Sequence, residues 1–216
     1  MIDFKKFCKL SVMIALAATP HAVVKSHLNK NAKNTLKNTH KNIKNEQHSY
    51  FSKLASKESG GNYNVTNRYG YLGKYQMGEM ALIQAGLYKK KSKDINNKWD
   101  GEWTEKAKQF KVYNKDDFLS NEEIQEYAVR EYTKENWKLV KHFKLHRYIG
   151  KTKDGITITH SGILAGTHLV GIGGLKKYLE KDIMSKDGNG VQITAYLDDL
   201  SGYAAPSNIN FYEIES

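Results

Sequence analysis

The apolar residues of the chain recur at helical spacing in several stretches, and the first of these ends at Glu58. Its apolar face consists of Tyr50, Phe51, Leu54 and Ala55, and Glu58 continues the same face. Ser59-Gly60-Gly61 then ends the helix, because glycine readily adopts the left-handed conformation that follows a last helical turn. The pattern predicts a carboxylate at the end of a buried helix, facing a cleft. Partial loss of solvent favours the protonated carboxyl group that a general acid needs; the alternative interpretation is an ordinary exposed Glu.

Further along the chain, the same spacing predicts more helices and little strand. Helices are expected in residues 77–86, from the capping box Ser120-Asn121-Glu122-Glu123 to about Lys141, in residues 161–168 and in residues 192–200. Residues 155–159 could form a short strand or an extended connector. The fold class expected from these elements is α+β, predominantly helical, in one domain that covers residues 50–216.

The first residues of the chain have the pattern of a signal peptide. A basic lead, residues 1–9, precedes a short apolar run from Leu10 to Ala18 that is too short to span a bilayer. Cleavage after Ala17, Ala18 or Ala22 remains open, so residues 1–22 are assigned to the signal peptide, with an uncleaved membrane anchor as the alternative. The single cysteine, Cys8, lies in this segment, so the mature protein would contain none. We therefore expect an exported protein, either periplasmic or secreted.

Residues 23–49 form a Lys/Asn-rich stretch of low complexity. Six lysines and one glutamate give it a formal charge of +5, out of +11 for the whole chain. One interpretation is a solvated linker, and the other is electrostatic docking to an anionic surface such as a cell wall, an outer membrane or a nucleic acid. The stretch has no interleaved aromatic or arginine residues, so nothing in it favours specific nucleic-acid binding.

Several polar and aromatic residues after Glu58 are candidates for a binding site. Trp99 and Trp103 flank Asp100-Gly101-Glu102, and they could stack on sugar rings or pack the loop against the core. Glu79, Asp100 and Glu102 could each supply a second carboxylate, although Glu79 at a helix start would usually be a solvated surface residue. No cysteine or histidine cluster has metal-ligand spacing, and Asp187 alone does not make a calcium loop, so neither a metal nor a cofactor is expected.

Three blocks of the sequence resemble the lysozyme-like lytic transglycosylases, over roughly Tyr50 to Tyr203. Glu58-Ser59 matches the Glu-Ser of that family, and Gly73-Lys74-Tyr75-Gln76 matches its Gly-x-x-Gln segment. Gly166 to Gly173 is similar to the family's Ala-Ala-Tyr-Asn-Ala-Gly-x-Gly block, with two departures. His168 stands where the family has Tyr, and Leu169 stands where it has Asn. The His-Leu form also resembles some phage-type relatives.

The resemblance implies a lysozyme-like domain with a sugar-binding groove and a peptidoglycan substrate. Glu58 would be the single catalytic acid and base in cleavage of the MurNAc–GlcNAc β-1,4 bond. Tyr75 and Gln76, together with Ser59, would hold the sugar near Glu58. His168 would orient or polarise the Glu58 carboxylate, although a lone His on a helix of small residues could equally belong to the core.

Other functions remain open at the level of the sequence. A hydrolytic lysozyme would recruit Glu79, Asp100 or Glu102 as its second carboxylate. A non-catalytic wall-binding protein would keep the groove without the reaction, and a basic secreted protein would bind nucleic acid or membrane through its tail. For the enzyme, the expected partner is a peptidoglycan glycan strand, and we expect a monomer.

Overall fold

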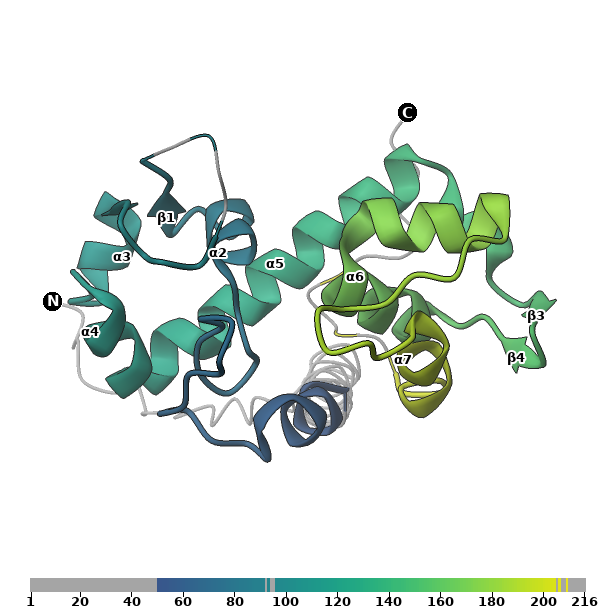
Figure 1. Cartoon of the computed structure of the whole chain (residues 1–216), viewed down its shortest axis with the longest axis horizontal. Helices are drawn as coiled ribbons and strands as arrows, with labels where there is room; N and C mark the ends of the chain where they lie inside the picture. The colour runs from purple at the N-terminus through teal and green to yellow at the C-terminus, as the bar shows by residue number, and fades with distance from the viewer. Residues whose placement is uncertain (1–49, 92, 94–95, 205, 207–208, 210–216) are drawn as a thin grey trace, which may run out of the picture. The chain divides into compact units, whose positions relative to one another are not determined.

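The computed structural model describes residues 50–91, 93, 96–204, 206 and 209, all of which belong to one compact unit. The expected signal peptide (1–22) and basic linker (23–49) lie outside the described residues. The described chain is mostly helical, as predicted (Figure 1). Its first helix, residues 50–59, is called the Glu58 helix below. The elements that follow are α2 (Glu79–Gln84), β1 (Tyr88–Lys89), β2 (Glu102–Trp103), α3 (Glu105–Gln109), α4 (Lys115–Ser120), α5 (Glu122–His142), η1 (Leu145–Tyr148), β3 (Thr152–Lys153), β4 (Ile156–Thr157), α6 (His160–Lys181) and α7 (Ile193–Asp199).

The strands form two short antiparallel pairs. Tyr88 pairs with Trp103 in the β1–β2 pair, and Thr152 pairs with Thr157 in the β3–β4 pair. Strand β4 of the second pair lies within the stretch 155–159, where either a short strand or a connector was predicted. With strands of two residues each, helix packing provides most of the structure.

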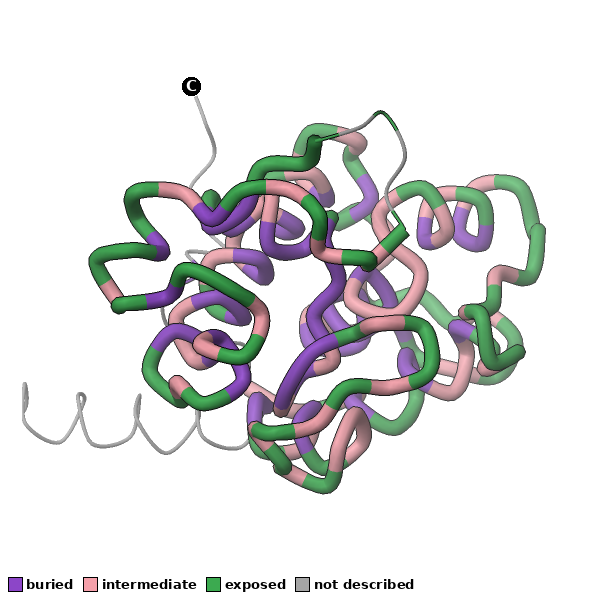
Figure 2. Tube along the Cα trace, turned by 60° about the vertical axis from the view of Figure 1, so that its left-hand side comes forward, coloured by how far each residue is buried: buried purple, intermediate pink, exposed green. Residues whose placement is uncertain are grey.

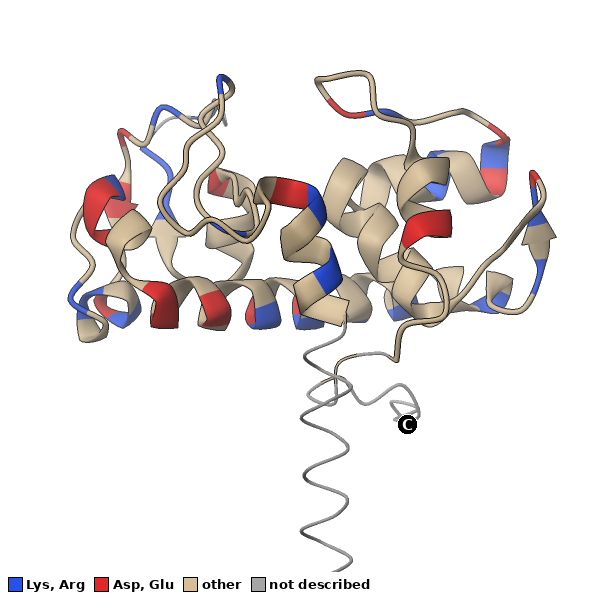
Figure 3. Ribbon diagram, turned by 90° about the horizontal axis from the view of Figure 1, so that it is seen from below, with Lys and Arg blue, Asp and Glu red and all other residues tan. Residues whose placement is uncertain are grey.

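The long helix α5 runs through the middle of the described chain, with other helices on its inner side and charged residues on its outer side (Figures 1 and 3). Its buried residues are Ile124, Gln125, Ala128, Val129, Tyr132, Thr133, Asn136, Trp137 and Val140. They recur every three or four positions, which is the spacing that places one face of a helix against a core. Helices α2, α4 and α6 all contact this helix.

The predicted capping box at Ser120 is wrong by one residue. Asn121 is the N-cap of α5, and its side chain accepts a hydrogen bond from the Ile124 backbone N–H at 3.1 Å. Ser120 is instead the last residue of α4, where its hydroxyl donates to the Asp116 carbonyl at 3.0 Å. The extended backbone of Asn121 separates the two helices, so the side chain that can cap α5 comes from Asn121.

Helix α6 changes direction at Gly171, whose φ of 67° and ψ of 173° are not helical. Before this point the helix is nearly continuously buried, from Ser161 to Thr167. A Cβ added at Gly166 would lie 3.3 Å from the Ile193 side chain of α7. The absence of a side chain at Gly166 therefore permits close contact between α6 and α7. The predicted tight packing of residues 161–168 is confirmed.

The buried residues form one hydrophobic cluster that includes side chains from the Glu58 helix, α2, α5, α6 and α7. Figure 2 shows the buried positions gathered on the inner sides of the helices, while the connecting loops are largely exposed. In the part of the chain that the structure describes, no helix combines the length and the apolar character that crossing a bilayer requires.

Candidate active site

Glu58 lies in the last turn of its helix, and two glycines end that helix as predicted. Gly60 and Gly61 have φ values of 65° and 84°, which other residues adopt with strain. The Gly61 N–H donates to the Ala55 carbonyl at 3.1 Å and the Gly60 N–H donates to the Ser56 carbonyl at 3.2 Å, the pair of bonds that closes a Schellman C-cap. This sharp end leaves Glu58 partly accessible, with 13% of its side chain exposed.

Tyr196 and His168 both face the same oxygen of Glu58. The Tyr196 hydroxyl, from α7, donates to Oε1 at 2.7 Å, and Nε2 of His168, from α6, lies 3.5 Å from Oε1. Burial raises the pKa of the Tyr196 phenol, and the negative charge of Glu58 and the hydrogen bond to it raise the pKa further. Tyr196 therefore stays protonated and acts as a donor. No described residue bonds to Oε2, which leaves that oxygen for a ligand.

His168 contacts the backbone of Tyr75 as well as the Glu58 side chain. Its Nε2 lies 3.0 Å from the Tyr75 carbonyl oxygen, which can only accept, so Nε2 carries the proton. Nδ1 is buried and has no hydrogen-bond partner among the described residues. We therefore assign a proton to Nε2. The ring edge packs on Tyr132, with 5.8 Å between ring centroids.

Two adjoining cavities open beside Glu58, and together they are called the Glu58 groove below. The first, of about 300 Å³, is lined by Glu58, Asn67, Tyr69, Asp187 and Asn189, among others. The second, of about 530 Å³, is lined by residues that include Met80, Tyr132, Val170, Lys177 and Lys186. The cavities share Tyr71, Gln76, Asn97, His168 and Leu169. Amide and aromatic side chains make up most of the lining of the first cavity, a mixture that suits a ligand rich in hydroxyl groups and ring faces.

The first cavity is bridged by hydrogen bonds between loops that are distant in sequence. The Tyr69 hydroxyl donates to the Gly188 carbonyl at 2.9 Å, and the Arg68 guanidinium donates to Asn189 Oδ1 at 3.1 Å. These two bonds, called the loop bridge below, join its two sides. Asp187 fixes its own turn, because its Oδ1 accepts from the backbone N–H groups of Asn189 and Val191.

Of the residues expected to bind sugar, Gln76 and His168 line both cavities. The Tyr75 side chain does not reach the groove, because it is 1% exposed and its hydroxyl lies 2.9 Å from Glu126 Oε1. Only its backbone carbonyl reaches the site. Ser59 also acts through the backbone: its hydroxyl donates to the Lys74 carbonyl at 2.8 Å. The Tyr75 side chain is therefore not placed to hold a sugar in the groove, and Ser59 does not line either cavity.

The two tryptophans pack into the core and line neither cavity. Their rings stack with 6.0 Å between centroids, and Trp103 is only 7% exposed. Trp99 is half-buried, and its indole N–H donates to the Gly70 carbonyl at 2.8 Å. Of the two interpretations, the structure supports packing of the loop against the core and gives no support to sugar stacking by Trp99 or Trp103.

The candidate second carboxylates also lie elsewhere. Glu79 is 2% exposed, so its interpretation as a solvated surface residue is wrong. The loop between β1 and β2 folds back over the start of α2, and Glu79 accepts hydrogen bonds from the backbone N–H groups of Asn96, Asn97 and Trp99. Asp100 and Glu102 are exposed and line neither cavity. Asp187 does line the first cavity with Glu58.

Sequence reasoning missed Tyr196 and gave Asp187 no role beside Glu58. Tyr196 lies in the predicted helix of residues 192–200, but the spacing of apolar residues in that helix indicates only that Tyr196 is buried. Asp187 was considered only as a calcium ligand in a turn. Neither residue has a local pattern that points to Glu58, because Tyr196 reaches it only once α7 is packed, and Asp187 shares its cavity from the turn between α6 and α7. No three His, Cys, Asp or Glu side chains among the described residues are placed to hold a metal ion.

The three sequence blocks that carry the resemblance meet at this site. Ser59 follows Glu58 and bonds to Lys74, while His168 contacts both Tyr75 and Glu58. Comparison of the chain with protein-family models, with curated proteins and with solved structures gave no match. The geometry of these residues is therefore the basis for assigning a function.

Proposed function

We propose that this protein is a peptidoglycan-degrading enzyme with a lysozyme-like domain, and that it cleaves the MurNAc–GlcNAc β-1,4 bond as a lytic transglycosylase. One observation carries the proposal: Glu58 lies in a cavity lined mainly by amide and aromatic side chains, with Oε1 accepting a hydrogen bond from Tyr196 and facing His168, and Oε2 left for a ligand. An ordinary exposed Glu would have neither the cavity nor these two neighbours. The meeting of three separate sequence blocks around this residue adds support.

In the proposed reaction, Glu58 acts first as an acid and then as a base. Protonated at Oε2, it gives its proton to the glycosidic oxygen as the bond from that oxygen to the muramyl C1 breaks. The Tyr196 hydroxyl, which donates to Oε1, stabilises the carboxylate that remains. The carboxylate then takes the proton of the muramyl 6-hydroxyl while O6 bonds to C1, which closes a 1,6-anhydro ring. Water is neither consumed nor released, so one carboxylate suffices.

A second candidate, a hydrolytic lysozyme, is favoured by the position of Asp187 in the same cavity as Glu58. Hydrolysis of a glycoside commonly uses two carboxylates, one of which activates water or attacks C1. Asp187→Asn distinguishes the two, because an Asn side-chain oxygen can still accept the turn hydrogen bonds while the charge is removed. A transglycosylase should keep most of its turnover in this variant, whereas a hydrolase that depends on Asp187 should lose it.

The decisive experiment digests purified sacculi and determines the masses of the released muropeptides. A transglycosylase gives anhydro ends that are one water lighter than the reducing ends left by hydrolysis. Glu58→Gln should abolish detectable release of fragments. The loss of a general acid usually lowers the rate by a factor on the order of 10²–10⁴. Its melting temperature should stay close to that of the parent protein.

Glu102→Gln is the matched control, because Glu102 is exposed and lies outside the groove. It should cleave at the parent rate. Near-parental turnover in Glu58→Gln would overturn the assignment of Glu58. Binding of the parent protein to sacculi without any released fragment would instead identify a non-catalytic wall-binding protein.

We also propose that the enzyme is exported. Export through residues 1–22 would deliver it to the periplasm or the exterior, where peptidoglycan is found. The basic stretch 23–49 would add affinity for an anionic surface. We propose a monomer that acts without a metal or a cofactor.

A further inference from the structure

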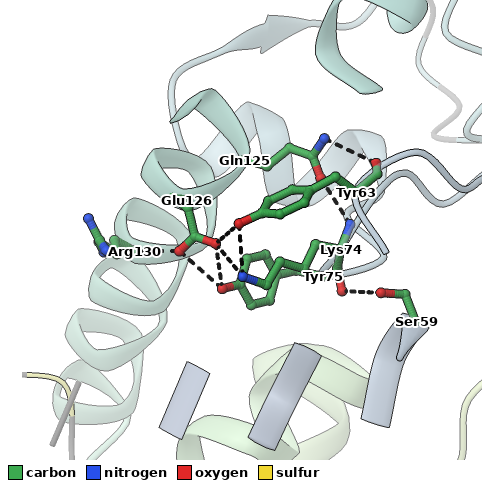
Figure 4. A network of polar contacts seen from close by, with 7 residues as sticks. All are labelled: Ser59, Tyr63, Lys74, Tyr75, Gln125, Glu126 and Arg130. Carbon is green, nitrogen blue, oxygen red and sulfur yellow. Dashed lines mark hydrogen bonds and ion pairs between the residues drawn. The ribbon is translucent and has the colours of Figure 1, made fainter. Parts of the chain in front are cut away.

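Behind the Glu58 groove, three donors surround the carboxylate of Glu126, a residue of α5 (Figure 4). Its Oε1 accepts from Lys74 Nζ at 2.7 Å and from the Tyr63 hydroxyl at 2.8 Å, and lies 2.9 Å from the Tyr75 hydroxyl. Burial alone would raise the pKa of Glu126, but the hydrogen bonds and charge of Lys74 and the tyrosine bonds outweigh it and hold the pKa below its ordinary value. Glu126 is therefore an ionised, partly buried group that lines neither cavity.

The backbone of the same segment is fixed as tightly as its side chains. The Lys74 N–H donates to Gln125 Oε1 at 2.9 Å, and the Lys74 carbonyl accepts from Ser59. At Gly73, an added Cβ would lie 2.0 Å from Gln125 Oε1, so only glycine allows this approach. Residues 73–76 are thus clamped between α5 on one side and the end of the Glu58 helix on the other (Figure 4).

This clamped segment supplies the carbonyl that orients His168. The Tyr75 carbonyl oxygen lies 3.0 Å from His168 Nε2, and the same nitrogen lies 3.5 Å from Glu58 Oε1. A displaced carbonyl would free the imidazole to rotate or to move its proton to Nδ1. An Nε2 without a proton would present a lone pair to the Glu58 carboxylate instead of a donor.

We infer that Glu126, together with Lys74, is a positioning residue of the active site. It acts through the Tyr75 carbonyl to fix the tautomer and the orientation of His168 beside Glu58. Glu126 itself touches no substrate. The kinetic part of this inference rests on the proposed function, whereas the effect on His168 does not.

The test replaces Glu126 with Gln, which keeps the size of the side chain and one acceptor oxygen but removes the charge that pairs with Lys74. On sacculi, kcat should fall by on the order of tenfold, because small displacements of catalytic groups have large effects on rate. KM should stay within about twofold, since no groove residue is changed. The pH dependence of kcat should also change, because the donor opposite Glu58 is no longer fixed.

A direct readout of His168 tests the inference without any substrate. Nitrogen-15 NMR of the imidazole should show one tautomer, protonated at Nε2, in the parent protein, and a mixture of tautomers in Glu126→Gln. Lys74→Met removes the other half of the ion pair and should give the same mixture; it also replaces Glu126→Gln if that variant does not fold. The double variant should be little worse than either single one, because both act through the same contact.

Glu135→Gln is the matched control, since it removes one charge from the same helix, where the carboxylate pairs with Lys138. It should leave kcat and the His168 spectrum unchanged. Folded Glu126→Gln and Lys74→Met proteins with a single Nε2–H tautomer would overturn the inference, as would parental kcat and pH dependence. If the parent protein does not cleave sacculi, the proposed function fails, and the His168 spectrum alone decides the positioning role.

Discussion

At the scale of single residues, the two oxygens of Glu58 have different environments. Oε1 accepts from Tyr196 and faces His168, while no described residue bonds to Oε2. A carboxyl group held in this way presents one oxygen to a ligand in a fixed orientation. Both steps of the proposed reaction use that oxygen, so the donors at Oε1 should influence the rate more than the binding of substrate.

Tyr196→Phe tests this division of roles. Removing the hydroxyl should lower kcat on sacculi by roughly tenfold with little change in KM, because the lost hydrogen bond, worth about 1 kcal/mol or more to a charged acceptor, stabilises the carboxylate. Initial rates across a range of substrate concentrations measure the effect. Tyr178→Phe is the control: it also loses a hydrogen bond to a carboxylate, that of Asp154, but Tyr178 does not contact Glu58. Equal losses of activity in the two variants would contradict the role of Tyr196.

Sequence reasoning identified the residues whose local pattern carries information and missed those that arrive through packing. Glu58 was found because helix spacing and two glycines mark its position. Tyr196 was missed because its hydroxyl reaches Glu58 only after α7 packs beside the Glu58 helix. The Tyr75 side chain was misplaced for a related reason, since Tyr75 lies in a turn and its partner Glu126 lies on α5, distant in sequence.

At the scale of elements, the C-cap of the Glu58 helix sets where the carboxylate sits. Gly60 has a φ of 65° with open space around an added Cβ, so a substitution there introduces backbone strain and no clash. The same holds at Gly155, in the turn between β3 and β4, where φ is 80°. Substitution of either glycine therefore introduces a similar backbone strain, at Gly60 close to Glu58 and at Gly155 away from the groove.

Gly60→Ala and Gly155→Ala should each destabilise the fold by about 1 kcal/mol, the usual cost of a left-handed alanine. Only Gly60→Ala should also lower kcat, because relaxing its strain moves the last helical turn and Glu58 with it. Urea unfolding and sacculus digestion measure the two effects. Parental kcat in a Gly60→Ala protein with the expected loss of stability would show that the cap does not position Glu58.

Helices were predictable from local spacing, whereas the contacts at their ends were not. The periodicity of α5 predicted its length well, but its cap moved from Ser120 to Asn121 because α4 ends directly before it. Glu79 was expected at the surface because acidic residues favour helix starts. It is buried because a loop that follows β1 returns to donate three backbone N–H groups to it.

At the scale of the whole molecule, Glu126 links acid stability to the active site. Its pKa is lower in the folded protein than the ordinary value of 4.5, so the unfolded chain takes up the proton first. The stabilisation is fully present above about pH 4.5 and is lost as the pH falls through the folded pKa. The free energy of unfolding of Glu126→Gln should accordingly fall less steeply than that of the parent below this pH. Parallel slopes in urea titrations at several acidic pH values would contradict the assignment.

The basic stretch should be separable from the proposed chemistry. Deleting Lys25 to Asn45 should leave cleavage of soluble glycan fragments unchanged, because every residue of the Glu58 groove lies beyond it. Binding to sacculi should weaken mainly at low salt, where charges are least screened. Sedimentation with sacculi at two salt concentrations measures the binding. Lost activity on soluble fragments would show that the stretch belongs to the folded domain.

We expect the groove to open when both hydrogen bonds of the loop bridge break. Two exposed hydrogen bonds contribute about 1–2 kcal/mol together, so the open form would be populated at roughly one part in ten. A strand that lies across Glu58 must select this minor form, which weakens its apparent affinity by the same factor. A strand end, which can enter without crossing the bridge, escapes that penalty. Tyr69→Phe keeps the ring and removes one bond, so KM should fall for long strands and stay unchanged for short fragments; equal KM shifts for both would show that the bridge does not sort substrates by length.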